Sequence, residues 1–134
     1  MSIPRWAEKY IGLPFDDHKQ HCWWLIRKVF RDEKGIKLPS YAGADAKTLV
    51  RVARLMMQPE FDTWVPVAFS HPFDVIQMTA RRIGRLRPKL HVGIAVSETH
   101  LLHIEERTSS VIVPFDHPTI KFRIAGMYRH KELA

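Results

Sequence analysis

The fold is decided by the stretch CWWLIRKVFRDEKG, residues 22–35 of a 134-residue chain. Its apolar side chains recur at the spacing of one helix face, and its charged side chains occupy the opposite face. Gly35 ends the pattern, as glycine often does just beyond the last turn of a helix. The predicted helix therefore has one face to bury, which comprises Cys22, Leu25, Ile26, Val29 and Phe30.

The sequence on either side of this helix divides into a helical first half and a strand-rich second half. A short helix is predicted between Ser2 and Gly12, and another over residues 45–57. The hydrophobic period then changes towards two, which is typical of strands. Six strands are predicted, at residues 64–69, 73–79, 90–96, 101–105, 110–115 and 122–128. Helices followed by strands predict an α+β fold, with N-terminal helices packed on a largely antiparallel sheet in a single domain over residues 1–134.

Composition and charge exclude several classes of protein. No apolar run approaches the roughly 18–20 residues of a membrane span. The N-terminal residues lack the pattern of a signal peptide, so we expect synthesis in the cytoplasm. A single cysteine excludes an internal disulfide framework. The formal net charge of +7 favours anionic partners. Nucleic acid is an unlikely partner because no recognition motif is present, although four arginines cluster at Arg81, Arg82, Arg85 and Arg87.

Cys22 is a candidate nucleophile because it begins the predicted helix. Unpaired backbone N–H groups and the positive end of the helix dipole stabilise a thiolate there, so we expect a lowered thiol pKa. A lone cysteine on an apolar helix face is, however, more often part of the core.

His91 is a candidate base because it lies in an otherwise apolar predicted strand, LHVGIAV, residues 90–96. A structural histidine is the alternative. If residues 97–99 form the turn after this strand, Val96 pairs with His100, and Gly93 lies opposite His103. His91 and His103 then share a face as diagonal neighbours, roughly 7–8 Å apart. In that register His103 can orient the ring of His91 for proton transfer from a thiol.

A zinc site formed by Cys22 and histidines is the competing interpretation of the same residues. His18 and His21 flank the cysteine and could join His91 as ligands, but their spacing matches no zinc signature. We therefore expect neither a metal nor a cofactor.

Seven segments of the sequence follow one another in the order of a known family pattern. The segments are YIGLPF (10–15), CWWLIRKVFR (22–31), GIKLP (35–39), FDVI (73–76), HVGI (91–94), LH (102–103) and IAGMYR (124–129). Together they resemble the NlpC superfamily of papain-like, cell-wall cysteine peptidases, and the last resembles its bacteriophage tail branch. The resemblance extends over nearly the whole chain and implies a papain-like fold.

This resemblance implies catalysis by Cys22 as nucleophile, His91 as base and His103 as the orienting third residue. It implies hydrolysis of peptide bonds in peptidoglycan stem peptides through an acyl-enzyme, by a protein that joins other phage tail proteins and acts at the bacterial cell wall. Three positions depart from the family pattern. His21 replaces an aspartate, Trp24 replaces a small residue, and Phe15 replaces a tyrosine whose hydroxyl lies near the oxyanion.

The departures leave a structural tail subunit without turnover as the main alternative. A basic nucleic-acid-binding module, and an amidase or acyltransferase that acts on another amide, remain open as well.

Overall fold

The computed structural model describes residues 3–16, 21–39, 63–79, 90–105 and 109–134. Its helical elements are α1 (Arg5–Glu8), α2 (Cys22–Val29), the π-helical turn η1 (Phe30–Lys34) and the 3-10 turn η3 (Lys131–Leu133). Its strands are β1 (Trp64–Pro66), β2 (Val75–Thr79), β3 (Leu90–Ala95), β4 (His100–His103), β5 (Val111–Pro114) and β6 (Ile124–His130).

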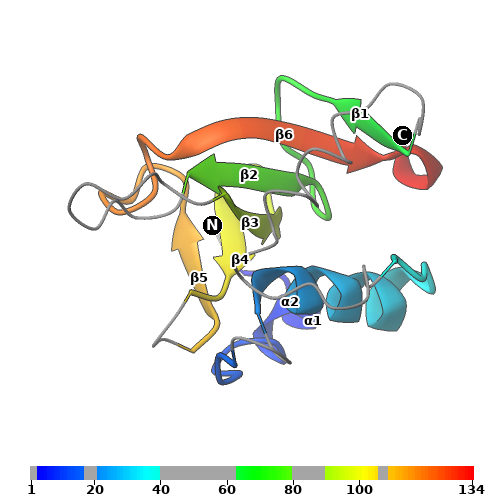
Figure 1. The fold of residues 1–134 in the computed structure, drawn as a ribbon, viewed down its shortest axis with the longest axis horizontal. Helices are drawn as coiled ribbons and strands as arrows, with labels where there is room; N and C mark the ends of the chain where they lie inside the picture. The colour runs from blue at the N-terminus through cyan, green and yellow to red at the C-terminus, as the bar shows by residue number, and fades with distance from the viewer. Residues whose placement is uncertain (1–2, 17–20, 40–62, 80–89, 106–108) are drawn as a thin grey trace.

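The strands form one six-stranded sheet in the order β1-β6-β2-β3-β4-β5, and every neighbouring pair is antiparallel. Figure 1 shows α1 and α2 on one side of this sheet, below β3 and β4 in that view. The predicted α+β fold and all six predicted strands are confirmed, with ends shifted by a few residues. The predicted helix at 45–57 and the arginine cluster at 81–87 lie outside the described residues. No helix in the described segments is long and apolar enough to cross a membrane.

The amphipathic helix buries the face that its sequence predicts. All five apolar-face residues are at most 3 % exposed, and α2 packs against β3. The helix widens into η1 before it ends at Gly35, whose φ of 65° is left-handed. Glycine adopts that conformation without steric cost. The core between helix and sheet thereby fixes the N-terminus of α2 beside β3.

A buried serine fastens the segment after α1 to the far edge of the sheet. The Oγ of Ser110 accepts a hydrogen bond from the Leu13 N–H at 2.8 Å and donates one to the Tyr10 carbonyl. The backbone of Ser110 also accepts from Gly12 and donates to Leu13. Phe15 follows the residues that are hydrogen-bonded to Ser110, and its side chain packs against the main core.

An ion pair joins two of the segments that resemble the NlpC superfamily. Nε and Nη2 of Arg129 each donate to the Asp74 carboxylate at 2.9 Å. The side chain of Asp74 is 1 % exposed, and its carboxylate also accepts from the His71 N–H. Such a bidentate, buried pair is costly to break because it would leave one charge unpaired. Asp74 and Arg129 therefore fasten β2 to β6.

Phe73 adopts a φ of 75° in the turn before β2, a left-handed value that is uncommon for a residue other than glycine. The Asp74 N–H donates to the His71 carbonyl, as in a type II turn whose third residue prefers glycine. The phenyl ring stacks on Trp6 with ring centroids 4.4 Å apart. Its packing offsets a backbone strain of about 1–2 kcal/mol.

Candidate active site

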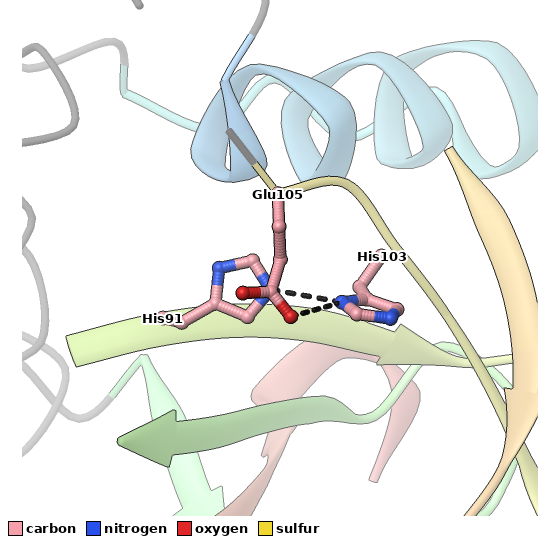
Figure 2. A group of neighbouring side chains, drawn as sticks. All are labelled: His91, His103 and Glu105. Carbon is pink, nitrogen blue, oxygen red and sulfur yellow. Dashed lines mark hydrogen bonds and ion pairs between the residues drawn. The ribbon is translucent and has the colours of Figure 1, made fainter. Parts of the chain in front are cut away.

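His91 and His103 meet on one face of the sheet, as their predicted register requires. Ile94 pairs with Leu102, and the Val96 N–H donates to the His100 carbonyl at 3.0 Å. Nε2 of His91 lies 3.0 Å from Nδ1 of His103, a hydrogen-bonding distance. Both side chains are buried, and Figure 2 shows the two rings pointing toward each other from neighbouring strands. The structure thus confirms the predicted pairing of the two rings.

Gly93 permits this close approach of the two strands. A Cβ at this position would lie 3.1 Å from the Leu102 carbonyl oxygen and 3.2 Å from Cβ of His103. The first of these atoms belongs to the backbone and cannot rotate away. A side chain at position 93 would therefore push β4, and His103 with it, away from His91.

We expect Gly93→Ala to destabilise the protein by about 1–3 kcal/mol, as other overpacking substitutions do, and to weaken the contact between the two rings because His103 is displaced. Urea unfolding measures the first effect, and nuclear magnetic resonance of the histidine ring nitrogens measures the second. Gly126→Ala is the control: the three atoms nearest to a Cβ there all belong to the side chain of Tyr128, the closest at 3.0 Å. Equal changes in the ring signals of His91 and His103 in the two variants would contradict this explanation.

Cys22 occupies the first position of α2, where its sulfur lies beside β3. The N-cap is His21, whose Nδ1 accepts a hydrogen bond from the Trp24 N–H at 3.3 Å. His21 thus caps the helix, a role for which aspartate, the residue of the family pattern at this position, is also suited. The thiol interacts with the backbone N–H of Val92, the residue next to His91, and is 3 % exposed. The contact described for the sulfur is therefore to the backbone beside His91.

The expected lowering of the thiol pKa is wrong. Burial raises the pKa of Cys22 to about 12, and the backbone N–H groups of Val92, Trp23 and Cys22 itself only partly oppose that rise. The negative charge of Glu105 raises the pKa of the thiol further. Desolvation disfavours a thiolate more than the helix terminus favours it, because almost no water reaches the sulfur.

Burial has the matching effect on the base. It lowers the pKa of His91 to about 3; the Glu105 carboxylate opposes this shift, whereas His103 and Arg123 add to it. At neutral pH the site therefore holds a thiol and an uncharged imidazole. Such an imidazole can accept a proton without first losing one.

These two shifts predict a stability optimum between about pH 6.5 and 9. Unfolded His91 takes up a proton near its ordinary pKa of 6.5, which the folded chain resists down to about 3, so stability falls as the pH drops below 6.5. Unfolded Cys22 loses its proton near 9.0 and the folded thiol near 12, so stability also falls above pH 9. Each slope is at most about 1.4 kcal/mol per pH unit.

Urea unfolding of wild type, His91→Gln and Cys22→Ala over a series of pH values measures these slopes. His91→Gln should reduce the loss of stability below pH 6.5, and Cys22→Ala should reduce the loss of stability above pH 9. Profiles of identical shape in all three proteins would contradict the assignment.

Glu105 and Arg123 extend the site beyond the three residues that the sequence predicts. Oε1 of Glu105 lies 3.5 Å from Nδ1 of His103. Nη1 and Nη2 of Arg123 donate to the two oxygens of Glu105 at 2.8 and 3.2 Å. Burial by itself would raise the pKa of Glu105, but Arg123 and the two histidines lower it on balance, so the carboxyl group is ionised. The sequence signal was a charged residue two positions after His103, beyond a buried strand.

A metal could approach the ligand atoms of His91, His103 and Glu105, which all lie within 4.8 Å of one another. Arg123, however, already engages both carboxylate oxygens and places a positive charge beside them. The arrangement fits a hydrogen-bonded histidine pair beside an ion pair better than a cation site. Of the zinc ligands considered from sequence, His18 lies outside the described residues, and His21 caps α2.

The other two departures from the family pattern are apolar side chains, Phe15 and Trp24. Both are half-buried and pack against the main core. His100, at the start of β4, bonds through Nδ1 to the Thr99 hydroxyl at 2.8 Å.

The comparisons with known proteins identify the fold. No family model matches the sequence, and no curated protein matches it. Among solved structures, a protein described as similar to a lipoprotein of the NLP/P60 family, from Staphylococcus aureus, has a TM-score of 0.57 at 18% sequence identity. The match covers 93% of this chain but 39% of that one, so the chain corresponds to about two fifths of that protein. The chain is therefore similar in fold to an NLP/P60 family protein.

Proposed function

We propose that the chain is a cysteine peptidase that hydrolyses peptide bonds in peptidoglycan stem peptides. The observation that carries this proposal is the buried, hydrogen-bonded His91–His103 pair on β3 and β4, with Cys22 against the backbone of the residue beside His91. Similarity in fold to an NLP/P60 family protein supports it. The papain-like arrangement of nucleophile, base and orienting residue is part of the proposal.

The contact between the two histidine rings supports one direction of proton transfer. Nε2 of His91 is engaged by His103, which leaves Nδ1 as the ring nitrogen that takes the thiol proton. The sulfur then attacks the carbonyl carbon of the scissile bond, and the imidazolium returns its proton to the leaving amine. Water hydrolyses the thioester with His91 again as base, and the thiol is regenerated. The N–H of Cys22 is a candidate donor to the oxyanion.

Because the resting pair is uncharged, the mechanism resembles that of a serine hydrolase more than that of a preformed thiolate–imidazolium pair. The base removes the proton as the sulfur attacks, so no stable thiolate is needed. Such a mechanism agrees with both the raised pKa of the Cys22 thiol and the lowered pKa of the His91 imidazole.

We place the enzyme in a bacteriophage tail, where it would act at the bacterial cell wall together with other tail proteins. The support is the IAGMYR segment, which lies in β6 and supplies Arg129 of the ion pair with Asp74. A net charge of +7 suits an anionic wall polymer.

A structural tail subunit without turnover is the second candidate. The specific observation in its favour is the sulfur of Cys22, which is 3 % exposed and whose pKa burial raises to about 12. Phe15 also lacks the hydroxyl that the family pattern places near the oxyanion.

Digestion of purified peptidoglycan distinguishes the two candidates. Wild type should release muropeptides with newly formed amino termini, detected by liquid chromatography and mass spectrometry, and Cys22→Ala should release none. Absence of product from folded wild type would favour the structural subunit. Undiminished product from Cys22→Ala would contradict the assignment of the nucleophile.

A further inference from the structure

We propose that Glu105, held by Arg123, acts through the two histidines of the site: it stabilises the positive charge that they acquire in the reaction. This inference rests on the proposed peptidase function. It adds a carboxylate and a guanidinium to the pair of contacting histidines, His91 and His103.

The contacts run in an unbroken line through the site. Nε2 of His91 lies 3.0 Å from Nδ1 of His103, which lies 3.5 Å from Oε1 of Glu105, which lies 2.8 Å from Nη1 of Arg123. Figure 2 shows the carboxylate directed at the space between the two rings. A carboxylate at this position is close enough to stabilise a positive charge on either imidazole.

Arg123 determines where the carboxylate lies. Its two terminal nitrogens bind both oxygens of Glu105, and Nη1 also donates to the Thr119 carbonyl at 3.1 Å. Both side chains are largely buried, at 20% exposure for Glu105 and 12% for Arg123. A planar guanidinium restricts a carboxylate to one orientation, and here that orientation keeps Oε1 toward His103.

The carboxylate matters most when a proton leaves the thiol. The S–H bond of Cys22 breaks, an N–H bond forms at Nδ1 of His91, and the Nε2 proton is shared with Nδ1 of His103. The ring pair then carries a charge of +1 beside a negative carboxylate. In a water-poor site this attraction is stronger than at the surface, so it favours proton transfer. The same carboxylate raises the pKa of the His91 imidazole, as its position predicts.

Glu105→Gln tests the proposal because glutamine keeps the shape and removes the charge. We expect kcat to fall about 10–100-fold, because loss of an opposite charge at this distance lowers the proton affinity of the ring pair by a similar factor, with KM unchanged. Glu132→Gln is the matched control: Glu132 also faces a histidine, at 3.8 Å from Nδ1 of His130, but is 61% exposed and lies at the opposite end of the sheet order. It should leave kcat unchanged.

Nuclear magnetic resonance of the histidine ring nitrogens provides a readout that needs no turnover. In Glu105→Gln the signals of His91 and His103 should change, and the pH at which the pair gains a proton should fall, because a nearby negative charge is lost. In Glu132→Gln only the signals of His130 should change. Glu105→Asp, which keeps the charge at a greater distance, should give kcat and ring signals between those of wild type and Glu105→Gln.

The proposal is overturned if folded Glu105→Gln keeps kcat within about twofold of wild type, or if the ring signals of His91 and His103 do not move. Should Glu105→Gln fail to fold, Glu105→Asp carries the same test, and ring signals identical to wild type would overturn the proposal. Because the ring signals are measured in the free protein, an inactive wild type would refute the peptidase function without deciding the role of Glu105.

Discussion

Replacing His91 with glutamine is expected to lower peptidoglycan turnover about 10²–10⁴-fold, the range that general-base catalysis contributes. Burial raises the pKa of Cys22 to about 12, so almost no thiolate forms without a base beside it. Glutamine can still bond to Nδ1 of His103 but cannot accept a proton. The loss should therefore appear in kcat, because the substitution removes the proton acceptor and changes little else of the side chain's shape.

The control for this variant is His100→Gln. His100 lies at the start of β4, and its Nδ1 bonds to the Thr99 hydroxyl. Its replacement should leave turnover unchanged. The assignment of His91 would be wrong if His91→Gln and His100→Gln digested peptidoglycan at the same rate while both stayed folded.

Cys22 is expected to react with iodoacetamide about 10³-fold more slowly than an unperturbed cysteine at neutral pH. The thiolate is the reactive form, and a pKa of about 12 against an ordinary value of 9.0 reduces its population by that factor. The helix N-terminus does not prevent this, because burial outweighs the effect of the local backbone N–H groups on the thiol pKa.

Intact-protein mass spectrometry over time measures this reaction, and the same protein unfolded in urea is the control. The unfolded chain should be alkylated at the rate of a free cysteine. Rapid alkylation of the folded chain at pH 7 would contradict the neutral resting pair and would instead indicate a preformed thiolate–imidazolium pair.

Much of the fold could be predicted because its determinants are local in sequence. The apolar face of the helix that begins at Cys22 follows from helix periodicity. The five residues of that face are all buried: Cys22, Leu25, Ile26, Val29 and Phe30. The pairing of His91 with His103 follows from one short turn, since Ser97 Oγ accepts from the N–H groups of Thr99 and His100 and closes the hairpin.

The rest of the site depends on contacts that no local pattern reports. Arg123 reaches Glu105 from 18 positions further along the chain, through a loop that precedes β6. The pKa of Cys22 was predicted in the wrong direction because the helix terminus is visible in the sequence, whereas the burial of its first residue against β3 is a tertiary property. The catalytic roles of Cys22, His91 and His103 remain predictions.

The most direct test of the account is to look for an acyl-enzyme on Cys22. Wild type mixed with peptidoglycan fragments and quenched in acid should contain a peptide spanning Cys22 that carries the mass of the acyl portion of the stem peptide, and Cys22→Ala should contain no such adduct. Muropeptide release by wild type with Cys22 never modified, together with equal release by Cys22→Ala, would contradict the account.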